Sequence, residues 1–201
     1  MPMNAIYVHG LGSGAATSGL STIAKILYQY KWHAVEVNES LPESVSIINA
    51  AVKELDPCLL MGTSLGGLYV MYADLSDHPG CRRILCNPAC HISKVIRQTI
   101  GFGKKEYFVP RQDGIQEYLL DEGVCAAFDK AIEEIVRPQA DIHRDYAVFS
   151  IHDELIGPEG ILENMVVCQQ AGYKVLLEDK GGHRLCRQSL RFIKEVIAEC
   201  V

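Results

Sequence analysis

Three residues that could together carry out nucleophilic catalysis lie in widely separated segments of the sequence. Ser64 stands in the segment GTSLG, Asp153 in SIHDEL, and His183 directly after two glycines. A serine hydroxyl is a weak nucleophile until a base removes its proton, and histidine can do this near neutral pH. An acid must in turn hold the imidazole in the right tautomer. We therefore predict Ser64 as the nucleophile, His183 as the base and Asp153 as the orienting acid.

The segment around Ser64 has the pattern of a sharp turn between a strand and a helix. Leu59, Leu60 and Met61 form a short apolar run typical of a buried strand, and residues 68–72 favour a helix. The G-x-S-x-G spacing between them is the nucleophile-elbow motif, in which larger residues at the glycine positions would collide with the strand and the helix. On its own, the same pattern also fits an ordinary glycine-rich turn.

The acid and the groups that would stabilise an oxyanion are less sharply defined. Asp179 lies four residues before the predicted base, and Glu154 directly follows Asp153. Asp153 is favoured because it comes just after a predicted strand. A tetrahedral intermediate also needs two hydrogen-bond donors for its negative oxygen. We predict the backbone N–H groups of Leu65 and of Leu11, which lies in the glycine-rich loop after the first strand.

Strands and helices alternate along most of the chain. Apolar runs predict strands at residues 4–8, 33–37, 59–61, 83–86, 146–151 and 173–177, and periodic apolar spacing predicts helices after most of them. Such an alternation requires crossover connections, so we predict a mainly parallel sheet of about six strands with helices on both faces. Ligands of these sheets bind beyond the carboxyl ends of the strands, where all three predicted catalytic residues are expected.

The alternation is interrupted between residues 91 and 145. This segment is apolar and periodic, so we expect it to be structured. We predict a helical insertion that covers the strand ends as a lid, within a single domain of residues 1–201. Packing of the same helices elsewhere on the sheet is the alternative. Five aromatic residues lie in the insertion, and we predict that Phe102 and Phe108 line a substrate pocket.

The composition argues against several classes of protein. The 201 residues carry a net charge of −6 without a block of like charges, which disfavours a nucleic-acid partner or an anionic membrane surface. No apolar run approaches the ~18 residues of a membrane span, and the first residues lack a targeting signal, so we expect a cytosolic protein. The eight cysteines contain no C-x-x-C pair and are expected to be reduced and mostly buried. No metal or cofactor is predicted.

Five segments of the chain resemble those of a known family. They are YVHGLGS near the start, GTSLGGLY around Ser64, ILCNPA at the end of the fourth strand, HDEL around Asp153, and GGH at His183. In order and spacing they are similar to small bacterial esterases of the YqiA/YcfP type, within the α/β-hydrolase superfamily. The resemblance implies a three-layer α/β-hydrolase fold and activity on short acyl esters, with the same three residues in the same roles. Arg184 departs from the family, which often has a small or aromatic residue after the histidine.

Two other functions fit parts of the sequence. The loop with Gly10 and Gly12 fits the G-x-G-x-x-A pattern of a dinucleotide-binding protein, and Glu36 lies where a ribose-binding acid is expected. A hydrolase fold used only for binding is the other alternative. Neither accounts for the three predicted catalytic residues together. We therefore expect a serine hydrolase that cleaves a small-molecule acyl ester or thioester through an acyl-enzyme.

Overall fold

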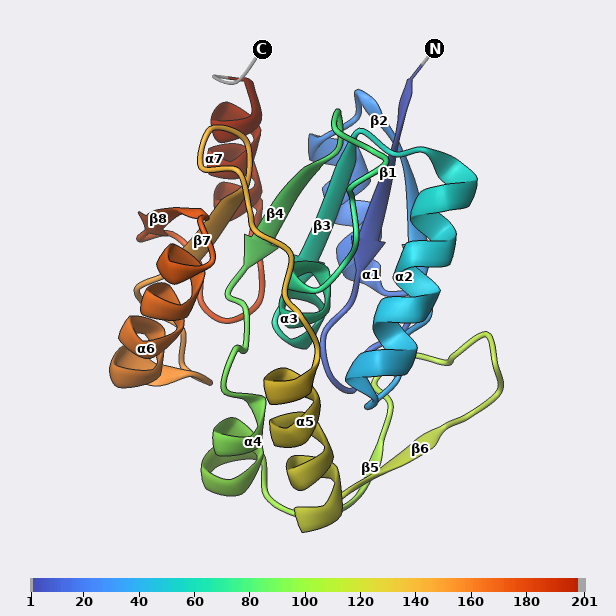
Figure 1. Cartoon of the computed structure of the whole chain (residues 1–201), viewed down its shortest axis with the longest axis vertical. Coiled ribbons are helices and arrows are strands. Elements are labelled where there is room, and N and C mark those ends of the chain that lie inside the picture. The colour runs from blue at the N-terminus through green and yellow to red at the C-terminus, as the bar shows by residue number, and fades with distance from the viewer. Residues whose placement is uncertain (1, 199–201) are drawn as a thin grey trace.

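A six-stranded parallel sheet forms the middle layer of the computed structural model, which describes residues 2–198 (Figure 1). The strand order is β2-β1-β3-β4-β7-β8, and every neighbouring pair is parallel. The predicted sheet of about six mainly parallel strands is therefore confirmed. The strands are Met3–Val8 (β1), Tyr30–Val35 (β2), Leu59–Thr63 (β3), Arg82–Cys86 (β4), Tyr146–Ser150 (β7) and Lys174–Glu178 (β8).

The edge strand β2 begins at Tyr30, earlier than the apolar pattern predicts, and ends at Val35. The strand extends back to Tyr30 because every second residue faces the same layer, and Tyr30, Trp32 and Ala34 all pack against one hydrophobic cluster. The rings of Tyr30 and Trp32 also contact each other, with centroids 5.8 Å apart. Val37, which the apolar pattern assigns to this strand, lies after it and is buried.

Helices cover both faces of the sheet and complete three layers. Tyr7 and Met61 belong to the hydrophobic cluster of α1 and α7, whereas their neighbours Ile6 and Leu60 belong to that of α2, α3 and α6. Successive strand residues therefore face opposite layers, and buried strands carry apolar side chains at nearly every position. The helices are Ser18–Ile26 (α1), Leu41–Leu55 (α2), Leu65–Met71 (α3), Gly157–Gln170 (α6) and Arg187–Ala198 (α7).

The helices and the β-hairpin of residues 91–134 lie beyond the carboxyl ends of the strands, at the bottom of Figure 1, whereas residues 135–145 run back along the sheet to the start of β7. The sequence analysis predicts a helical insertion and does not anticipate the hairpin, which lies between the helices α4 and α5. The hairpin places Gly103 opposite Leu120, and the rings of Tyr107 and Tyr118 lie 4.7 Å apart. Aromatic contacts of this kind stabilise antiparallel strands. The elements are Ile92–Val95 (α4), Ile96–Ile100 (η1), Gly103–Glu106 (β5), Glu117–Leu120 (β6) and Glu122–Glu134 (α5).

The two parts of the insertion are attached to the body differently. Cys125 and Phe128 of α5 are buried in the main hydrophobic cluster, so this helix is part of the core. On the hairpin, Lys104 and Glu106 are exposed. On the other strand of the hairpin, Leu120 is buried in the same cluster as α5, so the hairpin joins the core through β6.

The cysteines that the structure describes are all free thiols. They number seven, of which five are buried, and Cys200 lies outside the described residues. Burial raises the pKa of the Cys81 thiol to about 12, so this side chain stays protonated and unreactive. Among residues 2–198, no helix is both long enough and apolar enough to cross a membrane.

Candidate active site

Ser64 occupies a sharp turn between β3 and α3. Its backbone has φ 54° and ψ −122°, a conformation that costs energy for any residue other than glycine. A Cβ atom on Gly62 would overlap the carbonyl group of Gly66, and one on Gly66 would overlap the carbonyl groups of Val8 and His9. The two glycines therefore let the helix turn directly over the strand. The serine side chain is left at the carboxyl end of the sheet.

Ser64, His183 and Asp153 form a continuous chain of hydrogen bonds. The Ser64 Oγ lies 2.9 Å from Nε2 of His183, and Nδ1 of His183 lies 2.8 Å from Oδ2 of Asp153. The Asp153 side chain is fully buried, and its second oxygen accepts hydrogen bonds from the backbone N–H groups of Leu155 and Ile156. A carboxylate held in this way can keep the Nδ1 proton of the imidazole and leave Nε2 free to accept the serine proton.

The two competing acids have other partners. Asp179 forms an exposed ion pair with Lys180, 2.8 Å long, and the hydrogen bond from Lys180 lowers the pKa of its carboxyl. Glu154 accepts the backbone N–H of His183 at 2.9 Å, and this hydrogen bond lowers its pKa. Only Asp153, among these three acids, contacts the imidazole in the described structure. Glu154 instead holds the backbone of the histidine, a contact that sequence reasoning did not predict.

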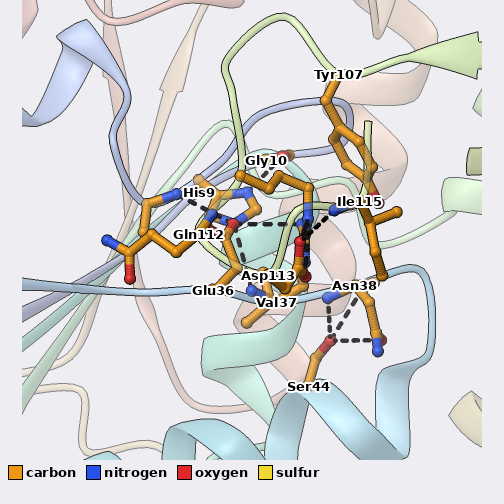
Figure 2. A network of polar contacts seen from close by, with 12 residues as sticks. His9, Gly10, Glu36, Val37, Asn38, Ser44, Tyr107, Gln112, Asp113 and Ile115 are labelled. Carbon is orange, nitrogen blue, oxygen red and sulfur yellow. Dashed lines mark hydrogen bonds and ion pairs between the residues drawn. The ribbon is translucent and has the colours of Figure 1, made fainter. Parts of the chain in front are cut away.

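The loop after β1 is held by Glu36, as Figure 2 shows. One oxygen of the carboxylate accepts the backbone N–H of Ala15 at 3.1 Å and lies 3.1 Å from Nε2 of His9. The other oxygen accepts the backbone N–H of Gln112 at 3.2 Å. From the sequence, Glu36 was a candidate ribose-binding acid. In the structure its carboxylate contacts His9, Ala15, Gln112 and Arg111, so Glu36 has a role in holding the loop that needs no nucleotide.

Arg111 connects the same loop to the segment between β5 and β6. Its buried guanidinium donates to the carbonyl of Val37 at 2.7 Å, lies 3.3 Å from Glu36 and stacks 4.5 Å from the ring centroid of Tyr107. It also pairs with Asp113. No pattern in the sequence links residue 36 to residue 111, because the link forms only when the insertion folds back over the sheet.

His9 is a structural member of this network. Burial lowers the pKa of its imidazole, so the neutral form is favoured. Its Nδ1 lies 3.0 Å from the carbonyl of Gly10, and Nε2 is the acceptor for the backbone N–H of Val37 at 3.3 Å. The neutral ring with Nδ1 protonated satisfies these two contacts, whereas a hydrogen bond from Nε2 to Glu36, 3.1 Å away, requires the proton on Nε2.

The architecture is shared with solved structures of known proteins. No protein-family model and no curated protein matches the sequence. Among solved structures, alpha/beta hydrolase domain-containing protein 10 from mouse has a TM-score of 0.64 at 11% identity, over 98% of this chain and 90% of that chain. The chain has the α/β-hydrolase fold. The esterase domain of a Rhodothermus marinus protein is also similar, with a TM-score of 0.56 at 17% identity, over 98% of this chain and 85% of that chain. A thioesterase domain from the curacin biosynthetic pathway has a TM-score of 0.59 at 14% identity, over 98% of this chain and 91% of that chain. Membership of the YqiA/YcfP type stays a prediction.

The α/β-hydrolase fold gives a reason for the positions of Leu11 and Leu65. In this fold, one oxyanion donor follows the nucleophile and the other comes from a loop after a neighbouring strand. Leu65 is the first residue of α3, where N–H groups have no acceptor within the helix. Leu11 follows Gly10, on which a Cβ atom would lie only 3.0 Å from Cβ of Ser64. The loop after β1 therefore passes directly beside the serine.

The loop after β1 and the start of α3 border one small cavity of about 10 Å³, lined by Gly10, Leu11, Gly12 and Leu65 among others. This volume is about that needed for one water molecule. The two residues predicted to supply the oxyanion donors thus border the same cavity.

The two aromatic residues predicted to line a pocket lie in different places. The backbone N–H of Phe108 donates to the carbonyl of Gly12 at 2.8 Å, and the guanidinium of Arg184 lies 5.7 Å from the centroid of its ring. Phe108 is therefore next to both the β1 loop and the histidine loop, although it is 73% exposed. Phe102 precedes β5 and is 49% exposed. The two residues therefore lie on opposite sides of β5 along the chain.

Residues 2–198 contain no group of three or more His, Cys, Asp or Glu side chains that could hold a metal ion.

Proposed function

We propose that this protein is a serine hydrolase that cleaves a small acyl ester or thioester. The observation that carries the proposal is the hydrogen-bond chain from Ser64 through His183 to the buried Asp153. The fold adds support, because proteins named as esterase and thioesterase domains share it. A purely binding role would not require this arrangement of nucleophile, base and acid.

The proposed reaction proceeds through an acyl-enzyme. Ser64 Oγ attacks the carbonyl carbon of the substrate while His183 Nε2 takes the hydroxyl proton. The carbonyl oxygen becomes negative and accepts hydrogen bonds from the N–H groups of Leu11 and Leu65. His183 then gives its proton to the departing alcohol or thiol. A water molecule, activated by His183, attacks the acyl group in turn, which releases the acid and restores Ser64.

Labelling with a fluorophosphonate probe tests the proposal. The wild-type protein is expected to be labelled and to hydrolyse short acyl esters, whereas Ser64→Ala is expected to lose labelling and on the order of 10⁶ in kcat. Ser13→Ala, in the neighbouring loop, is the matched control and should keep both. If Ser64→Ala retains more than about a tenth of the wild-type rate, the nucleophile lies elsewhere.

A further inference from the structure

The turn Asn87-Pro88-Ala89 directly follows β4, and backbone hydrogen bonds join Ser64 to the residue just before this turn and to the last residue of it. The backbone N–H of Ser64 donates to the carbonyl of Cys86 at 2.9 Å, and the N–H of Ala89 donates to the carbonyl of Ser64 at 3.1 Å. A Cβ atom on Gly67 would lie only 3.0 Å from Cβ of Pro88. The turn therefore packs closely against the first turn of α3 and moves with the serine.

The side chain of Asn87 reaches from this turn to the histidine loop. Its Nδ2 donates to the carbonyl of Gly182 at 3.0 Å and to the carbonyl of His183 at 3.1 Å. Its Oδ1 accepts the backbone N–H of Ser150, at the end of β7, at 2.7 Å. The residue is 2% exposed, and the loss of its side chain would leave the buried N–H of Ser150 without its acceptor and the carbonyls of Gly182 and His183 without this donor.

The histidine loop needs such an attachment. Gly181 and Gly182 give its backbone more freedom than other residues would. The backbone of Asn87 has φ 46°, a left-handed conformation that asparagine tolerates better than most residues. One amide group thus connects the strand that precedes Asp153, the loop that carries His183 and the turn that holds Ser64.

We propose that Asn87 is a positioning residue, which sets the distance between His183 and Ser64 by holding the histidine loop. This rests on the proposed function, because positioning has a kinetic consequence only if His183 acts as the base. A misplacement of about 1 Å at a reacting group can cost about 100-fold in rate. The loss of the amide should therefore act on the chemical step more than on substrate binding.

Two variants test the role of Asn87. Asn87→Asp keeps the size of the side chain but removes its donors, and Asn87→Gly removes the side chain while allowing the left-handed backbone. For both, measured well below their melting temperatures, kcat is expected to fall about 100-fold while KM changes by less than about threefold. Fluorophosphonate labelling of Ser64 should slow in parallel.

Asn4→Asp is the matched control. The Asn4 amide also donates to a backbone carbonyl, that of Leu55 at 2.7 Å, but at the opposite end of the sheet. This variant is expected to lower the melting temperature and keep the wild-type kcat. The positioning role is overturned if folded Asn87 variants keep kcat within about threefold of wild type, or if neither variant folds while Asn4→Asp does. An unlabelled, inactive wild type would instead overturn the proposed function.

Discussion

From the sequence, Glu154 and Asp179 were the alternatives to Asp153 as the orienting acid. The place of Asp153 in the sequence is just after a strand, and the structure puts its carboxylate 2.8 Å from the imidazole. Asp179 forms an ion pair with Lys180 instead, and Glu154 accepts the backbone N–H of His183. The carboxylate at the strand end is thus the one that contacts the imidazole, and its role as the acid stays a prediction.

Asp153→Asn is expected to lower kcat by about 10⁴, because an amide would favour the wrong tautomer of His183. Asp179→Asn removes a carboxylate of the same size and is the matched control. It should leave kcat nearly unchanged, since its exposed ion pair contributes little. Steady-state kinetics on a short acyl ester compares the two. The opposite pattern would assign the acid to the loop before His183.

Local sequence patterns mark the three predicted catalytic residues but not the residues that connect their loops. Ser64, Asp153 and His183 could be predicted because local glycines and strand ends mark them. The links made by Asn87, Glu36 and Arg111 could not, because their partners lie far away in the chain and are known only once the elements have packed. The catalytic roles themselves stay predictions, although the three side chains meet.

Among the elements, the β5–β6 hairpin differs most from expectation. Its segment contains glycines as well as charged and aromatic residues, but the helical spacing on either side dominates the sequence pattern. The hairpin leads to Phe108 at the loop after β1, while α5 is fixed in the core. We therefore propose that the hairpin is the part of the insertion that acts as a lid.

Phe108→Ala is expected to move the preferred acyl chain length upward, because removal of the ring leaves space beside the β1 loop and each methylene contributes roughly 1 kcal/mol. Phe102→Ala is the control, since that ring lies at the other end of β5. Hydrolysis rates from acetyl to octanoyl esters, with melting temperatures, provide the measurement. Equal profiles for wild type and Phe108→Ala would remove this residue from the pocket.

For the molecule as a whole, a buried ion pair lies at the end of the sheet opposite to Ser64. Arg83 at the start of β4 contacts Asp145, just before β7, at 3.0 Å, and both side chains are almost fully buried. The backbone N–H of Arg83 also donates to Asp145 at 2.8 Å. This pair holds together β4, which leads to Asn87, and β7, which leads to Asp153.

Asp145→Asn is expected to lower the free energy of unfolding by about 3–5 kcal/mol, because it leaves the Arg83 guanidinium buried without a countercharge. Glu134→Gln, which breaks an exposed pair with Lys130, should change it by less than about 0.5 kcal/mol. Urea denaturation measures both. A cost below about 1 kcal/mol for Asp145→Asn would show that the pair is not needed for stability.

The separation of Ser64 and His183 by 119 positions has a consequence during translation. At about 5–20 residues per second, a ribosome needs roughly 6 to 24 seconds to add the histidine after the serine. Throughout that interval the nascent chain carries its nucleophile without a base. Under the proposed function, a newly made chain would therefore begin to hydrolyse esters only after β8 has joined the sheet and delivered the loop that follows it.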